Sequence, residues 1–306
     1  MLRLAWVAAR LGVAALAAVT SACSSITFAA ANVPTLFGHY ERTTGIPYST
    51  DPRQRLDVYV PKASGIGRPV VIFWYGGSWQ MGHRSSYRFV GAALAERGFV
   101  TVLPDYRLYP QVKFPAFMDD GASAVAWVQQ HAQDFGGDPH RIVLMGHSAG
   151  AHMAAFLALN RAFLAKAGAD PNGIIGLVGL SGPYALAPNS RVLNTIFAKP
   201  YTEADWQPVR FVTREAPPTF LAHGLDDTVV AVAHTESLRD ALRADGVRVE
   251  THLYPGRSHA DTAAGLSIPA RKRVPVLEQS VQFIESLVTG CARDSTGIRE
   301  ARTPCG

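Results

Sequence analysis

The sequence has no long basic stripe, and its one run of three cationic residues is Arg271–Arg273. Its formal net charge is only +5 over 306 residues, and Arg3 and Arg10, two of the positive charges, lie at the extreme N-terminus. Nucleic-acid-binding domains usually carry a basic patch or stripe, so this class of protein is disfavoured. No internal repeat or low-complexity segment is present, and the 48% hydrophobic content is enough for one large core.

Long apolar runs are also scarce. One occupies Leu11–Val19, after the early arginines, and small residues follow it up to Cys23. The run is too short to span a bilayer comfortably, which predicts a signal peptide over residues 1–22 rather than a transmembrane helix. The segment "VTSAC" resembles the bacterial lipoprotein signal, although Thr20 stands where leucine is usual. We therefore expect an exported protein with a lipid anchor at Cys23, in the periplasm or at the outer membrane; ordinary signal cleavage nearby is the alternative.

Cysteine is rare as well. Besides Cys23 there are only Cys291 and Cys305, both in the polar C-terminal segment. Lipidation of Cys23 would leave an even pair in an exported protein, where disulfides persist. We expect a Cys291–Cys305 disulfide, with two free thiols as the alternative.

Segments of strand and helix character alternate along the rest of the chain. Continuous apolar runs such as "PVVIFWY" are typical of strands buried on both faces, and the intervening stretches are helix formers. This alternation predicts an α/β protein with a mostly parallel sheet and helices on both faces. The expected strands are 56–60, 69–75, 99–104, 141–146, 174–180, 218–224 and 248–255, and the expected helices are 87–96, 118–135, 149–159, 234–244 and 274–288.

The pattern also gives expected domain boundaries. Residues 23–50 lack helical periodicity and are expected to be a tether, residues 51–290 to be the folded domain, and residues 291–306 to be a C-terminal tail. The segment 184–216 interrupts the alternation and is expected to be a short cap. In such sheets ligands bind beyond the carboxyl ends of the strands, so the residues that follow strands are the candidate site.

The first candidate is Ser148 in "VLMGHSAGAH". G-x-S-x-G alone is weak, but here a buried strand precedes it and the helix former "AGAHMAAFLAL" follows it. That setting is typical of a nucleophile elbow, which exposes a strained serine and directs the Ala149 amide toward a developing oxyanion. The alternative is a glycine turn with an incidental serine.

A nucleophilic serine needs a base, and the base needs a carboxylate that orients it. In this architecture the chain order is Ser, acid, His. "FLAHGLDDTVV" places Asp226 and Asp227 directly after a strand, and "YPGRSHAD" places His259 in the loop after the next strand. His223 precedes a turn and is expected to be structural.

An oxyanion hole completes the set. "WYGGSW" follows the second strand and offers exposed backbone amides at Gly77 and Ser78, where glycine allows close approach to a carbonyl group. A tight loop without a ligand is the alternative.

The segments "YGGSW", "PDYRL", "FGGDPHRI", "GHSAG", "HGLDDTVV" and "GRSH" together resemble the landmarks of the α/β-hydrolase superfamily, in the esterase branch that includes carboxylesterases, feruloyl esterases and arylformamidase-like enzymes. The family pattern H-G-x-x-D-x-x-V selects Asp227 over Asp226 as the acid. The resemblance also implies that Gly77, Ser78 and Ala149 supply the oxyanion amides. Tyr75 stands where the family has a histidine that usually braces this loop.

The sequence thus predicts an α/β-hydrolase that cleaves small-molecule carboxylic esters with a Ser148–His259–Asp227 triad and needs no metal or cofactor. Two alternatives stay open. One is an amidase or peptidase with the same triad, and the other is a non-catalytic binding protein on a hydrolase scaffold.

Overall fold

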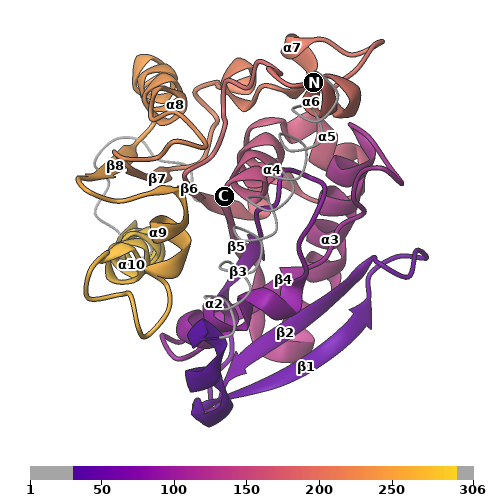
Figure 1. The fold of residues 1–306 in the computed structure, drawn as a ribbon. Helices are drawn as coiled ribbons and strands as arrows, with labels where there is room; N and C mark the ends of the chain where they lie inside the picture. Colours follow the sequence, from indigo (N-terminus) through magenta and orange to yellow (C-terminus); the bar gives the residue numbers. More distant parts are fainter. Residues whose placement is uncertain (1–29, 295–306) are drawn as a thin grey trace, which may run out of the picture.

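One eight-stranded sheet organises the protein. The computed structural model describes residues 30–294, and its strands lie in the order β1-β2-β4-β3-β5-β6-β7-β8 (Figure 1). β1 and β2 are antiparallel to their neighbours, and all pairs from β4 to β8 are parallel. The strands are β1 (Tyr40–Pro47), β2 (Arg55–Pro61), β3 (Arg68–Trp74), β4 (Val100–Pro104), β5 (Gly137–His147), β6 (Ile174–Leu180), β7 (Thr219–Gly224) and β8 (Val249–Tyr254).

Helices cover both faces of the sheet, which confirms the predicted fold class. α3 and α4 pack together on one face, and α2 and α10 lie on the other, where Arg97 after α2 pairs with Glu278 of α10 (Figure 1). The α-helices are α2 (Arg88–Ala95), α3 (Ala116–His131), α4 (Ala149–Leu159), α5 (Arg161–Lys166), α6 (Arg191–Ile196), α7 (Glu203–Trp206), α8 (Ala233–Ala244), α9 (His259–Ala264) and α10 (Val276–Asp294).

Burial explains why the central strands and helices could be predicted from the sequence. Every residue of β3 from Val70 to Trp74 has no exposed surface, as expected for a strand sandwiched between helices. α4 is buried on all sides, in keeping with its uniformly apolar sequence, whereas α8 buries only a stripe that includes Leu238 and Leu242. The carboxyl end of β5 and the start of α4 therefore sit at the middle of the molecule.

The expected tether over residues 23–50 is wrong in its second half. Tyr40–Pro47 form β1, an edge strand that pairs with β2, and a 3-10 helix (η1, Val33–Phe37) precedes it. Most of β1 is exposed, and its pairing shifts between Thr43 and Ile46. Because such an edge strand does not need an apolar face, its sequence "YERTTGIP" lacks the alternation that would predict a strand. At the other end, α10 continues to Asp294, so the expected tail from residue 291 begins as helix.

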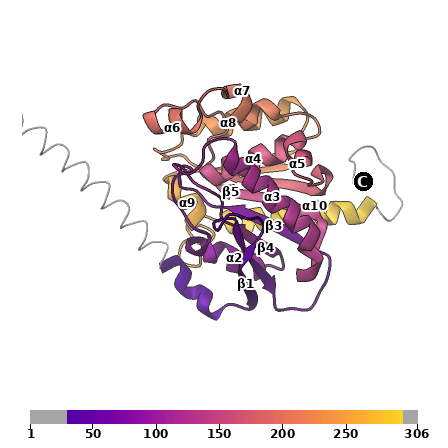
Figure 2. The ribbon, with the colours of Figure 1, turned by 90° about the vertical axis from the view of Figure 1, so that its right-hand side faces the viewer.

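The segment between β6 and β7 holds the two short helices α6 and α7 and the 3-10 turn η5 (Pro208–Phe211). It forms a separate layer above the sheet (Figure 2). The Phe197 ring in this layer contacts Trp79 at 4.8 Å and Phe114 at 5.7 Å between ring centroids. Across residues 30–294, no helix is both long enough and apolar enough to cross a membrane.

Candidate active site

Ser148 lies in a sharp turn between β5 and α4. Its φ of +56° falls in the left-handed region, which a serine enters only when the surrounding structure requires it. The flanking glycines permit the turn, because a Cβ atom at Gly146 would come within 2.2 Å of the Gly150 carbonyl oxygen. A Cβ at Gly150 would come within 2.1 Å of the Trp74 carbonyl oxygen. The strand, turn and helix therefore hold the serine side chain at the carboxyl edge of the sheet.

The structure brings the three residues predicted as a triad into one chain of hydrogen bonds. The distance from Ser148 Oγ to His259 Nε2 is 2.8 Å, and that from His259 Nδ1 to Asp227 Oδ2 is 2.7 Å. Because the carboxylate accepts from Nδ1, Nε2 is free to accept the Ser148 hydroxyl hydrogen. His259 is not in a loop as expected: it is the first residue of α9, whose start is capped by a reciprocal pair between Ser258 and Asp261.

Asp227 is held as a charged acceptor. Its Oδ1 accepts hydrogen bonds from the backbone N–H groups of Val229 and Val230, both at 2.8 Å, and its side chain has no exposed surface. Burial on its own would raise the pKa of this carboxyl group. The hydrogen bonds from His223, His259 and the Val230 N–H outweigh that effect and hold the pKa well below its usual range.

His223 has a part in the site that its sequence position did not suggest. Its Nε2 lies 3.1 Å from Asp227 Oδ2 and 2.9 Å from the Val230 carbonyl oxygen, so it carries the proton, and Nδ1 accepts from the Thr235 hydroxyl at 2.7 Å. His223 thus helps to orient the Asp227 carboxylate through the same oxygen that contacts His259. Its presence four residues before Asp227, in the same H-G-x-x-D segment, is the signal that could have revealed this.

The loop after β3 borders the serine. A Cβ atom at Gly76 would lie 2.9 Å from Ser148 Cβ, so the loop backbone is in contact with the turn that holds Ser148. Gly77 and Ser78 both have positive φ, and among the described residues neither backbone N–H has a hydrogen-bond acceptor. Ala149 is the first residue of α4, where N–H groups lack intrahelical partners. These are the three amides expected to bind an oxyanion.

Buried hydrogen bonds brace that loop from behind. The Tyr75 hydroxyl donates to Asp105 Oδ1 at 2.7 Å, and the Tyr106 hydroxyl donates to the Tyr75 carbonyl oxygen at 3.0 Å. Arg53 donates from Nη2 both to the Tyr75 hydroxyl and to the Gly82 carbonyl oxygen. Tyr75 therefore occupies the bracing position that the resemblance gave to a histidine.

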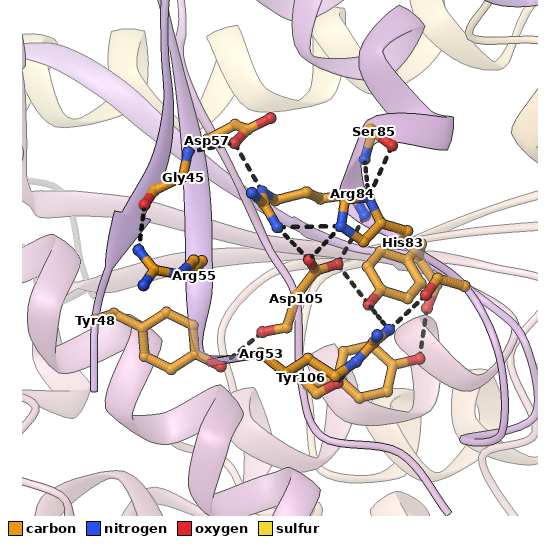
Figure 3. A network of polar contacts seen from close by, with 12 residues as sticks. Gly45, Tyr48, Arg53, Arg55, Asp57, His83, Arg84, Ser85, Asp105 and Tyr106 are labelled. Carbon is orange, nitrogen blue, oxygen red and sulfur yellow. Dashed lines mark hydrogen bonds and ion pairs between the residues drawn. The ribbon is translucent and has the colours of Figure 1, made fainter. Parts of the chain in front are cut away.

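The same brace continues through an ion-pair network to the antiparallel strands. Arg84 lies between Asp57 and Asp105, with Nε 2.7 Å from Asp57 Oδ1 and Nη1 bonded to Asp105 Oδ2 (Figure 3). The exposed imidazole of His83 lies 3.1 Å from the same Asp105 oxygen. The two buried carboxylates thus share one guanidinium between β2, β4 and the loop after β3, residues 75–79, which is called the oxyanion loop below for its expected role.

Other predicted sites fall where the structure gives no side chains. Cys23 and Cys305 lie outside residues 30–294, and Cys291 is within α10 but its side chain is not described. Asp226, the rejected alternative for the acid, is exposed, and it is Asp227 that pairs with His259.

Known proteins are similar to this chain in sequence and in fold. Residues 56–242 match the BD-FAE family. The chain is 32% identical to isoprenylcysteine alpha-carbonyl methylesterase ICME of Arabidopsis thaliana over 71% of this chain and 56% of that protein. It is 32% identical to esterase LipC of Mycobacterium tuberculosis over 72% of this chain and 60% of that protein. The match thus spans little more than half the length of these relatives.

Solved structures agree on the fold. Esterase B of Lactobacillus rhamnosis superposes with a TM-score of 0.79 over 95% of this chain and 100% of that one, at 20% identity. The sheet order, the tight turn at Ser148 after β5 and the family match lead to one assignment. The chain belongs to the BD-FAE family, within the esterase branch of the α/β-hydrolases.

Proposed function

We propose that the protein is a serine hydrolase that cleaves small-molecule carboxylic esters through an acyl-enzyme. One observation carries the proposal: Ser148 Oγ, the His259 ring and the Asp227 carboxylate are joined by hydrogen bonds of 2.8 and 2.7 Å. An isolated serine hydroxyl is a weak nucleophile at neutral pH, and this arrangement supplies the base that activates it.

In the first half-reaction Ser148 Oγ attacks the acyl carbon while His259 Nε2 takes the hydroxyl proton. Asp227 keeps the Nδ1–H tautomer and stabilises the imidazolium that forms. The donors to the negative charge that develops on the carbonyl oxygen are the N–H groups of Gly77 and Ser78, which have no acceptor among the described residues, and the Ala149 N–H at the start of α4.

His259 then returns the proton to the leaving alcohol. Water enters, loses a proton to the same imidazole, and attacks the acyl-serine, so that Ser148 is regenerated and the carboxylic acid leaves. His259 carries the proton in each of these reaction steps, and the proposed mechanism requires no metal or cofactor.

The names of the relatives support ester over amide substrates. The Arabidopsis relative is named a methylesterase, and the Mycobacterium relative is named an esterase. The test is hydrolysis of p-nitrophenyl acetate against the matched amide p-nitroacetanilide. We expect the ester to be cleaved much faster, and Ser148→Ala and His259→Ala each to lose at least about a thousandfold in kcat. Unchanged hydrolysis by Ser148→Ala would overturn the proposal.

We also propose that the protein is exported and held at a membrane by a lipid on Cys23. The support is the order of charged, apolar and small residues that ends in "TSAC". Because Ser24 rather than an aspartate follows the cysteine, the outer membrane is the favoured location in a Gram-negative host. An ester hydrolase at this location would act on esters of the envelope or the surroundings.

A further inference from the structure

His147, the residue before the nucleophile, has a buried imidazole that points to the base. Its Nε2 lies 3.0 Å from the backbone carbonyl oxygen of His259, and the two ring centroids are 4.8 Å apart. A carbonyl oxygen can only accept a hydrogen bond, so Nε2 of His147 carries the proton. Nδ1 of the same ring is buried and has no hydrogen-bond partner within residues 30–294.

The same carbonyl is tied to a second strand. Thr262 Oγ1 donates to the His259 carbonyl oxygen at 3.3 Å and shares a 2.9 Å hydrogen bond with Ser181 Oγ. Ser181 follows β6 with a φ of +48° and is fully buried. The backbone of His259 is therefore fastened to the ends of both β5 and β6, while its ring is fastened to Asp227.

His147 also contacts the oxyanion loop. A Cβ atom at Gly76 would lie 3.1 Å from His147 Nδ1. The imidazole thus lies between Gly76, which borders Ser148, and the residue that carries the base. A change in its shape or hydrogen bonding would displace two parts of the site relative to the nucleophile.

We propose that His147 is a positioning residue for His259. By donating Nε2–H to the His259 carbonyl oxygen, with Thr262 and Ser181 as a second tie, it keeps His259 Nε2 on Ser148 Oγ. The inference rests on the proposed function and adds a named residue to it. The tight turn requires small residues at Gly146 and Gly150, and it does not itself require a hydrogen-bond donor at position 147.

The charge state of His147 suits this role. Burial, followed by the neighbouring His259, lowers the pKa of His147 to about 3. The other titratable groups that face it are Asp227 and His223. A neutral ring donates the hydrogen bond without repelling the imidazolium that forms on His259 during each half-reaction.

The test compares two variants of the full chain in p-nitrophenyl acetate hydrolysis. His147→Leu fills the space but removes the donor, and we expect kcat to fall about 10- to 100-fold with KM within about threefold. His147→Gln offers an amide N–H to the same carbonyl and should keep kcat within about threefold of the wild type. Thermal unfolding confirms that both variants are folded at the assay temperature.

Equal kcat values for His147→Leu and His147→Gln would overturn the inference. If His147 only filled space, a side chain with a hydrogen-bond donor and one without would replace it equally well. If His147→Leu does not fold, Thr262→Val replaces it: a severalfold loss of kcat supports the role of the His259 carbonyl, and wild-type kcat overturns it. A wild type that fails to hydrolyse the ester, or a Ser148→Ala variant as active as the wild type, would instead refute the proposed function.

Discussion

Asp226 and Asp227 are adjacent in the sequence and opposite in environment. Asp227 accepts hydrogen bonds from two backbone N–H groups and from the imidazoles of His223 and His259, whereas Asp226 is exposed. This difference shows what the residue pattern alone could provide. The expected chain order of Ser, acid and His limited the candidates for the triad acid to these two residues, and only the resemblance to a family motif distinguished them. The hydrogen bonds that distinguish them in the structure come from His223 in β7 and His259 in α9, which are far apart in the sequence.

The first prediction uses this pair as its own control. Asp227→Asn replaces an acceptor oxygen with an amide and stabilises the wrong tautomer of His259, so we expect kcat for p-nitrophenyl acetate to fall by about four orders of magnitude. Asp226→Asn should stay within about threefold of the wild type. A crippled Asp226→Asn with a tolerated Asp227→Asn would show that the acid is the other residue.

A second prediction concerns pH and stability. Burial lowers the pKa values of both His147 and His152 to about 3, whereas an unfolded histidine titrates near about 6.5. Below pH ~6.5 the unfolded chain binds protons that the folded chain does not. The free energy of unfolding therefore has its full contribution from the two neutral, buried imidazoles above that pH. It decreases as the pH falls toward 3, by about 1.4 kcal/mol per pH unit for each residue.

Urea unfolding of the wild type between pH 7 and pH 4 measures this slope. His152→Leu, which removes one of the two buried imidazoles, should flatten it, and His140→Gln at an exposed site should not. A slope that is the same in His152→Leu and in the wild type would contradict the assignment of a neutral, buried His152.

At the scale of elements, the sequence was most informative where burial is complete. β6 and α4 have the predicted boundaries because their apolar runs face neighbours on all sides. β1 and the short cap helices α6 and α7 were not predicted, since an exposed edge strand and four- to six-residue helices leave no periodic signal. The brace behind the oxyanion loop was equally hidden, because Arg53, Arg84 and Asp105 come from three separate segments.

A third prediction tests that brace. Arg84→Ala would leave the buried carboxylates of Asp57 and Asp105, which are 4% and 2% exposed, without their shared cation. We expect the free energy of unfolding to fall by about 3–5 kcal/mol, because an uncompensated buried charge is costly. Arg97→Ala, which breaks the partly exposed pair with Glu278, should cost less than about 1 kcal/mol. Equal losses in the two variants would contradict the brace.

At the scale of the whole molecule, the order of strands and helices along the chain determines both the fold and the location of the candidate site. Alternating strands and helices predicted the parallel sheet, and the residues that follow β3, β5, β7 and β8 all meet at its carboxyl edge. Cys23 and Cys305 lie outside the residues that the structure describes, so the lipid anchor and the Cys291–Cys305 disulfide stay predictions.

The fourth prediction concerns the anchor. In a Gram-negative host, the full-length protein should partition into detergent with the membranes, and Cys23→Ala should release or mislocalise it. Mass spectrometry of the mature N-terminus measures the modification directly. A fully water-extractable native protein with an unmodified N-terminus would rule out lipidation, without bearing on the chemistry of Ser148.

The most direct test of the central claim is the site of covalent labelling by a fluorophosphonate. This reagent modifies a serine only where a base activates it, so peptide mapping by mass spectrometry should find one adduct, on Ser148, in the wild type. Ser148→Ala should give no adduct and no ester hydrolysis. An adduct on a different residue, or hydrolysis that persists in Ser148→Ala, would contradict the assignment of Ser148 as the nucleophile.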